Sequence, residues 1–127
     1  MYLRFVLEQI DERTGKFTGL FTLAYYLRDE NKLNHYEEEQ IQELLKWFKK
    51  HLPIPDRFSK NKNNSHKNTN GLSWFKPSSK EAINKMWELK AIIENHGFNI
   101  QVLKTDRPGY VVYEDEYQIV AESFNGE

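Results

Sequence analysis

The sequence has 127 residues, no cysteine, and 18 basic against 19 acidic side chains. This length and a hydrophobic fraction of 39% indicate one soluble globular domain over residues 1–127. The lack of cysteine excludes a disulfide scaffold, an iron–sulfur centre and a cysteine nucleophile. No apolar run approaches the roughly 20 residues that span a bilayer, and the amino-terminal residues lack the pattern of a signal peptide. We therefore expect a cytoplasmic protein without membrane contact.

The first thirty residues predict a strand followed by a helix. Residues 2–9 are rich in strand formers, and residues 11–15 have the composition of a turn. From residue 19 to residue 29, apolar side chains recur at helical spacing. This spacing favours a helix, although the Phe, Thr and Tyr residues in the segment also suit a strand.

The next segment is the clearest helix of the sequence. Asn34 or His35 precedes acidic residues at positions 37–39, and such residues suit the positive end of a helix dipole. Basic residues follow in the last turns, and Pro53 ends the helix. The apolar residues between these ends form one stripe at helical spacing: Ile41, Leu44, Leu45, Phe48 and Leu52.

The middle of the chain predicts a loop and then a third helix. Residues 59–70 contain no apolar side chain, so burial cannot offset the entropy cost of ordering them, and we predict a mobile loop. Ser78 and Glu81 fit the Ser-x-x-Glu capping box that begins a helix. Apolar residues such as Met86 follow at helical spacing, and Gly97 favours the end of the helix.

The carboxy-terminal residues predict strands. Residues 98–105 alternate apolar and polar side chains, and residues 106–109 form a turn. Residues 110–113 and 117–122 are rich in strand formers, and residues 114–116 link them as a hairpin. The chain therefore predicts an α+β fold, with about three helices packed on one face of a mostly antiparallel sheet of about four strands.

Charge is unevenly distributed along the chain. Residues 46–80 carry nine basic side chains and one acidic side chain, whereas residues 106–127 carry one basic and six acidic side chains. Clustered cations attract anions more strongly than the net charge of −1 suggests. The alternative interpretation of the basic block is a solvated helix end followed by a polar loop.

The basic block contains the first candidate site, which interleaves cations with aromatic residues. Arg57 and Lys76 are suited to phosphate or carboxylate, Trp74 to stacking on a base, and Ser78 marks a helix start with free N–H groups. These residues predict a pocket for an anion or a nucleotide. The alternative is that Trp74 belongs to the core, Lys76 is solvated and Ser78 only caps its helix. The spacing around Gly71 matches no phosphate-binding loop.

Two further arginines are candidate ligand contacts. Arg28 follows Tyr25 and Tyr26 at the end of the first predicted helix, where it can stack on an aromatic ring or join Arg57 in one pocket. Arg107 lies at a predicted hairpin tip, where the turn chemistry of residues 106–109 is sufficient without any function.

Acidic residues and histidines predict no metal site. Glu114 and Glu116 can share one side of a strand, but a cation would need oxygen ligands from elsewhere, so we expect an exposed acidic turn. The four histidines lack zinc-binding spacing. We therefore predict no metal, no cofactor and no catalytic residue.

Residues 72–76 and 105–122 carry a family resemblance. Together with Tyr25–Asp29, Trp47–Phe48 and residues 57–59, they resemble a family of small uncharacterised bacterial proteins over nearly the whole chain. Members of that family typically have proline where this chain has Ser123. The resemblance implies a single-domain cytosolic protein of bacterial or phage origin, and it implies no activity, cofactor or catalytic residue.

The sequence supports three functional hypotheses in a definite order. The first is a non-enzymatic binding protein for a nucleotide, a nucleic acid or another anionic ligand, with Arg28, Arg57, Trp74, Lys76, Ser78 and Arg107 as candidate contacts. The second is a protein–protein adaptor or inhibitor in regulation or host–phage conflict, or a chain that self-associates through its opposite charge blocks. The third is a small metal-dependent phosphoesterase using Glu114 and Glu116, for which no nucleophile and base stand at a recognisable spacing.

Overall fold

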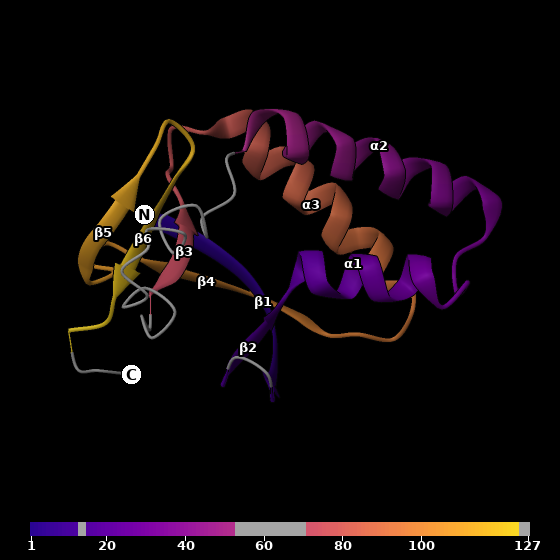
Figure 1. The fold of residues 1–127 in the computed structure, drawn as a ribbon, viewed down its shortest axis with the longest axis horizontal. Helices are drawn as coiled ribbons and strands as arrows, with labels where there is room; N and C mark the ends of the chain where they lie inside the picture. Colours follow the sequence, from indigo (N-terminus) through magenta and orange to yellow (C-terminus); the bar gives the residue numbers. More distant parts are fainter. Residues whose placement is uncertain (13–14, 53–70, 125–127) are drawn as a thin grey trace, which may run out of the picture.

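A computed structural model describes residues 1–12, 15–52 and 71–124 of the chain. Three helices and six strands form an α+β fold (Figure 1). In chain order the elements are β1 (Tyr2–Asp11), β2 (Lys16–Gly19), α1 (Leu20–Asp29), α2 (His35–His51), β3 (Leu72–Phe75), α3 (Lys80–Glu94), β4 (Ile100–Thr105), β5 (Tyr110–Glu114) and β6 (Gln118–Glu122).

The predicted fold class and the three helices are confirmed, but the predicted number of about four strands is wrong. The two additional strands are β2 and β3, which have four residues each. Such short segments carry little periodicity of their own, and pairing decides their conformation: β2 pairs with the preceding strand β1, and β3 with the distant strands β1 and β6. The predicted mobile loop at residues 59–70 lies outside the described residues.

Every strand pairing that the structure describes is antiparallel. The hydrogen-bonded path runs β2-β1-β3-β6-β5, and β4 pairs with β1 away from this path. Residues of β1 that pair with β4 also pair on their other side, Leu3 with Phe75 of β3 and Val6 with Gly19 of β2. Strands β2 and β3 therefore lie one after the other along the same edge of β1. In the described structure neither strand pairs with β1 between Leu3 and Val6, which leaves a gap between β2 and β3.

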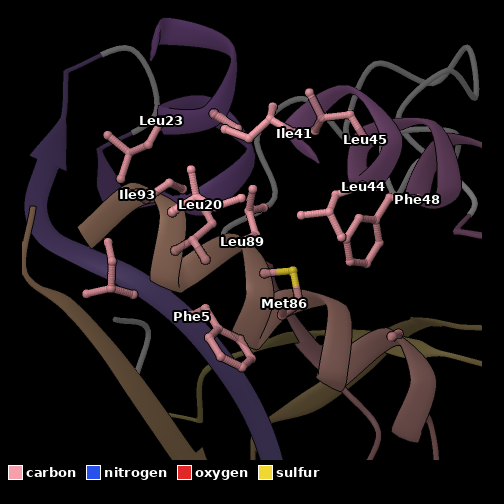
Figure 2. Packing of buried hydrophobic residues seen from close by; sticks show 14 of the residues in the cluster. Phe5, Leu20, Leu23, Ile41, Leu44, Leu45, Phe48, Met86, Leu89 and Ile93 are labelled. Atoms are coloured by element: carbon pink, nitrogen blue, oxygen red, sulfur yellow. The ribbon is translucent and has the colours of Figure 1, made fainter. Parts of the chain in front are cut away.

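The three helices form a layer on one face of the sheet, which we call the helix face (Figure 1). Phe5 of β1 points into this layer toward Met86 of α3 (Figure 2). Leu89, which follows Met86 by about one helical turn, is fully buried. Apolar residues at helical spacing supply the remainder of the core, and burying them is the main favourable contribution to folding. The buried core on this face includes Leu20, Leu23, Leu27, Ile41, Leu44, Phe48, Phe75, Ile92, Ile93 and Ile100.

A second, smaller apolar cluster lies on the other side of the sheet, which we call the opposite face. Trp74 pairs with Ile119 across β3 and β6, and Ala121 completes the buried cluster. Leu103 of β4 packs against it. Both faces of the sheet therefore carry apolar side chains, but only the helix face has helices packed on it in the described part of the chain.

The start of α2 is fixed by a capping box. The Asn34 side chain accepts a hydrogen bond from the Glu37 backbone N–H at 2.8 Å, and the Glu37 carboxylate accepts one from the Asn34 backbone N–H at 3.2 Å. The prediction that α2 begins next to Asn34 is thereby confirmed. These reciprocal bonds satisfy backbone donors that have no partner within the helix.

The capping box predicted from Ser78 and Glu81 is wrong. The N-cap of α3 is Ser79, and its side chain forms no capping hydrogen bond. Instead, Ser79 Oγ lies 2.7 Å from the carbonyl oxygen of Lys76 and 3.0 Å from that of Tyr117. The hydroxyl therefore joins the start of α3 to the β5–β6 hairpin rather than to its own helix.

The predicted hairpin around residues 114–116 is confirmed, and Asp115 organises it. Its Oδ1 accepts hydrogen bonds from the backbone N–H groups of Tyr117 and Gln118 at 2.8 and 3.0 Å. Its Oδ2 accepts from the Tyr113 hydroxyl at 2.9 Å and from the Gln118 side-chain amide at 3.2 Å. An aspartate that binds the backbone two residues on is a common turn device, and it replaces the glycine that the sequence lacks here.

Candidate functional site

A pocket of about 200 Å³ lies where β2 and β3 part along the edge of β1. Arg4 and Phe5 line it from β1, between the residues that pair with β3 and with β2. Gly19 lines it from the end of β2, and Ser73 and Trp74 line it from β3. The pocket therefore occupies a break in the sheet, and side chains from both faces of the sheet contribute to its walls.

Arg4 is the charged residue of this pocket. It pairs with Leu103 across β1 and β4, and paired residues share a face, so Arg4 lies on the opposite face with Trp74. Its Nη1 donates a hydrogen bond to the carbonyl oxygen of Ser73 at 3.1 Å. Burial lowers the pKa of Arg4 to about 10. Among the residues that the structure describes, no carboxylate forms an ion pair with it.

Trp74 is a second polar contributor to the pocket. The residue is 9% exposed, and its indole Nε1 has no hydrogen-bond acceptor within the described part of the chain. A buried donor without an acceptor costs free energy, and most such donors in folded proteins have a partner. An acceptor atom placed beside the indole would remove that cost.

The inner wall of the pocket is mostly apolar and belongs to the helix face, where the buried amide of Gln118, which pairs with Phe75, is a polar member. Phe5 and Phe75 contribute aromatic rings from the sheet, and the helix layer contributes Leu20, Leu52 and Met86. These five side chains are each at least nine-tenths buried. The pocket is therefore polar where it meets Arg4 and mostly apolar where it reaches the core.

The structure leaves the predicted site residues dispersed. Of the six candidates, Trp74 lines the pocket, and Arg57 lies outside the described residues. Arg28 stands in the last turn of α1, and Arg107 precedes β5. The helix α1 and the strand β5 lie at opposite ends of the molecule (Figure 1), so these two arginines do not share a site.

Three of the predicted contacts have local partners or stand in solvent. Arg28 contacts Asp29 at 3.0 Å and stacks over the ring of Tyr25, as its position after the tyrosines predicts. Lys76 forms an ion pair with Glu114, and Ser78 is exposed.

The fourth, Arg107, places its guanidinium 5.2 Å from the ring centre of Phe124. Both side chains are exposed to solvent. Arg107 therefore belongs to an aromatic contact at the surface beside β5, away from the pocket at the β2–β3 break.

The acidic turn at residues 114–116 carries structural contacts. Asp115 holds the hairpin, and Glu114 pairs with Lys76. Within the described ranges, no group of three or more histidine, aspartate or glutamate side chains is placed to hold a metal ion. The arrangement of the described residues gives no support to a metal-dependent reaction at this turn.

Arg4 was missed by reasoning from the sequence. The available signal was one cation inside an otherwise apolar strand, Tyr2-Leu3-Arg4-Phe5-Val6-Leu7. A charged side chain within such a segment is rarely buried without a partner. Ser73, the residue it contacts, is 69 positions further along the chain, so local pattern could not identify the partner.

Comparison with known proteins adds no family to this description. No protein-family model, curated protein or solved structure matches the chain. The resemblance of residues 72–76 and 105–122 to small bacterial proteins stays a prediction. None of the helices that the structure describes combines the length and the apolar character needed to cross a membrane.

Proposed function

We propose that this protein is a non-enzymatic binding protein for a small anionic ligand, which Arg4 holds in the pocket between β2 and β3. The observation that carries the proposal is a cation at the wall of a pocket without a carboxylate partner among the described residues. Removing a charge from water is unfavourable unless an opposite charge or several hydrogen bonds compensate for it. A bound anion supplies that compensation.

The guanidinium of Arg4 keeps most of its hydrogen-bonding capacity for a ligand. Arginine has five N–H donors in a planar fork, and one hydrogen bond goes from Nη1 to Ser73. A carboxylate or phosphate accepts two parallel bonds from such a fork. The proposal keeps Trp74 from the residues predicted from the sequence and gives Arg4 the role first assigned to Arg28, Arg57, Lys76 and Arg107.

Titration against a panel of anions at two salt concentrations tests the proposal. The panel comprises acetate, octanoate, inorganic phosphate, adenosine monophosphate, and labelled single-stranded RNA and DNA, followed by calorimetry or fluorescence anisotropy. A small ligand in a pocket gives a modest dependence on salt, whereas nucleic acid gives affinity that falls steeply as salt rises. Binding of one small anion that weakens in Arg4→Met supports the proposal. The absence of binding by every member of the panel to the folded protein overturns it.

We propose self-association through β5 as a second candidate function, because this strand carries an exposed apolar surface. Tyr110, Val111 and Val112 are 63%, 51% and 44% exposed, and Phe124 packs beside Tyr110. Among the described strands, β5 stands at the end of the hydrogen-bonded path. An apolar strand at a sheet end is a template for pairing with another chain.

A second copy of this chain is the occupant that the charges favour. Antiparallel pairing of two β5 strands would bring the Arg107 end of one copy beside the Glu116 end of the other. Light scattering at low and high salt, with Val112→Lys, tests this association. A dimer that Val112→Lys dissociates supports it, and Tyr36→Lys on α2 is the matched control because Tyr36 is also exposed to solvent but lies far along the chain. A monomer at every concentration overturns it.

A further inference from the structure

We infer that the ligand of the β2–β3 pocket is a monocarboxylate with a short apolar tail, such as a medium-chain fatty acid. This inference rests on the proposed binding function and names the chemical class of its ligand. The carboxylate would lie against Arg4, and the tail would lie against the inner wall formed by side chains of the helix face.

The distribution of polar and apolar groups in the pocket sets the orientation of the ligand. Arg4 and Trp74 belong to the opposite face of the sheet, and the guanidinium of Arg4 marks the polar end of the pocket. The other end is lined mostly by apolar side chains such as Phe5, Leu52 and Phe75, together with the buried amide of Gln118. A ligand that satisfies both ends has a charged head and an apolar body. A compact inorganic anion would leave the inner wall without a partner.

The charge of the pocket favours one negative charge on the ligand. Among the described residues that line it, Arg4 is the one with a formal charge. Lys76, the basic residue that directly follows β3, is already paired with Glu114. A phosphate group near neutral pH carries up to two charges and needs further cations when it is removed from water. A carboxylate carries one charge and matches a single guanidinium in bidentate geometry.

The size of the pocket excludes a nucleotide as its occupant. Its volume is about 200 Å³, below the roughly 300–1,000 Å³ typical of sites that enclose drug-sized ligands. A nucleotide would place most of its surface outside the pocket. A short-chain or medium-chain acid has dimensions that the pocket can enclose.

Calorimetric titration with four probes separates the parts of the ligand. Octanoate has both head and tail, octanol has the tail without the charge, acetate has the head without the tail, and inorganic phosphate tests the competing anion. We expect octanoate to bind more tightly than the other three. We expect Arg4→Met to weaken octanoate binding by about tenfold or more, which is the order of a charge-assisted hydrogen bond.

Two further variants show whether octanoate binds in this pocket. They also provide a test that does not depend on Arg4, in case the Arg4→Met variant fails to fold. Gly19 lines the pocket, has an ordinary backbone φ of −83°, and has no described atom within 4 Å of the place that an added Cβ would take. Gly19→Leu is therefore expected to fold normally and to reduce octanoate binding by occupying space. Arg107→Met is the matched control, because Arg107 is an exposed arginine away from the pocket. It is expected to bind octanoate as the native protein does.

Nuclear magnetic resonance gives a readout that does not depend on affinity. The indole N–H of Trp74 lacks an acceptor among the described residues, so a carboxylate bound beside it should shift its proton resonance downfield. The resonances of Trp47 and Trp87 should stay in place. The Trp74→Phe variant assigns the signal by removing it.

The outcomes distinguish this inference from the proposed function. Phosphate binding that depends on Arg4, without octanoate binding, overturns the fatty-acid inference and leaves the anion-binding function standing. Equal binding of octanoate and octanol, or octanoate binding that neither Arg4→Met nor Gly19→Leu reduces, also overturns the inference. The absence of binding by all four probes to the folded protein overturns the inference, and it overturns the proposed function as well when the remaining members of the anion panel also fail to bind.

Discussion

Arg4 donates a hydrogen bond from its Nη1 to the carbonyl oxygen of Ser73 at 3.1 Å, at the point where β1 and β3 stop pairing. The backbone pairing between these strands consists of the single pair Leu3 and Phe75 in the described structure. Beyond this pair, the Arg4 side chain, instead of a backbone N–H group of β1, donates to the carbonyl oxygen of Ser73 in β3. The residue that we propose as the ligand anchor therefore also connects two strands.

Arg4→Met should change the free energy of unfolding by less than about 1 kcal/mol, because two effects oppose each other. The variant loses one hydrogen bond, which is worth roughly 0.5–1.5 kcal/mol. It also removes a partly buried charge, whose burial is unfavourable. Urea unfolding followed by tryptophan fluorescence at pH 7 measures the difference. A loss well above about 2 kcal/mol would show that the contact with Ser73 serves mainly to hold the strands together.

Ser79→Ala should destabilise the protein, whereas Ser78→Ala should not. Ser79 is 8% exposed, and its hydroxyl contacts the carbonyl oxygens of Lys76 and Tyr117. Removing it leaves buried acceptors with fewer partners, at a cost of about 1–2 kcal/mol. Ser78 is exposed. Thermal unfolding of both variants measures the difference, and equal melting temperatures would contradict the assigned role of Ser79.

Sequence reasoning identifies the helices because their signals are local. The start of α2 depends on Asn34 and Glu37, three residues apart, and its apolar stripe repeats within one segment. Strand β3 depends instead on β1 and β6, which are distant from it in the sequence, whereas β2 pairs with its neighbour β1 but has only four residues in which to show a period. Residues 72–75 nevertheless suggest a binding site, because the aromatic side chains of Trp74 and Phe75 can be recognised in the sequence without knowing that the segment forms a strand.

Of the predicted ligand contacts that the structure describes, only Trp74 lines the candidate site. A sequence shows which side chains are charged, but it does not show which of them are paired with an acidic residue in the fold. Arg28 is paired with Asp29, its neighbour in sequence, and Lys76 is paired with Glu114. Arg4 has no such partner among the described residues, and this property depends on the residues that surround it after folding. Lack of an ion pair does not by itself single out Arg4, because Arg107 has none among the described residues either; Arg4 differs in that it is partly buried and lines a pocket.

Glu37→Gln should lower stability at neutral pH and have little effect once the pH lies below the folded-state pKa of Glu37. Burial by itself raises the pKa of Glu37, but hydrogen bonds from Asn34 and His96, with the charge of His96, outweigh it and hold the pKa below the ordinary value of 4.5. Because the folded-state pKa is lowered, the stabilisation by the carboxylate is complete above about pH 4.5 and is lost as the pH falls through the folded-state pKa.

Denaturant unfolding of both proteins between pH 3 and pH 7 measures this effect of Glu37. The side chain joins the start of α2 to His96, two residues after the end of α3, with Glu37 Oε1 3.0 Å from His96 Nε2. We expect a difference of roughly 1 kcal/mol at pH 7, shrinking as the pH falls. The exposed Glu39→Gln variant is the control on the same helix. A difference that stays constant with pH would contradict the assignment.

Gly109→Ala should be the most damaging of three glycine substitutions, because two independent constraints meet at this position. Gly109 has a φ of +133°, and an added Cβ would lie 2.0 Å from the carbonyl oxygen of Glu122. Gly97 has a φ of +91° but no described atom within 4 Å of such a Cβ. Gly19 has neither constraint. The three positions therefore separate steric clash from backbone strain.

We expect a loss of more than about 3 kcal/mol for Gly109→Ala and about 1–2 kcal/mol for Gly97→Ala. Gly19→Ala should change stability by less than about 1 kcal/mol, because alanine restricts the unfolded chain but is a poorer N-cap of α1 than glycine. Urea unfolding at pH 7 ranks the variants. The close approach of Gly109 to Glu122 sets the start of β5, where Tyr110 pairs with Glu122 and packs on Phe124. A Gly109→Ala protein as stable as Gly97→Ala would mean that β5 can move away from β6 at this end, and that the apolar surface proposed for self-association is not rigidly held.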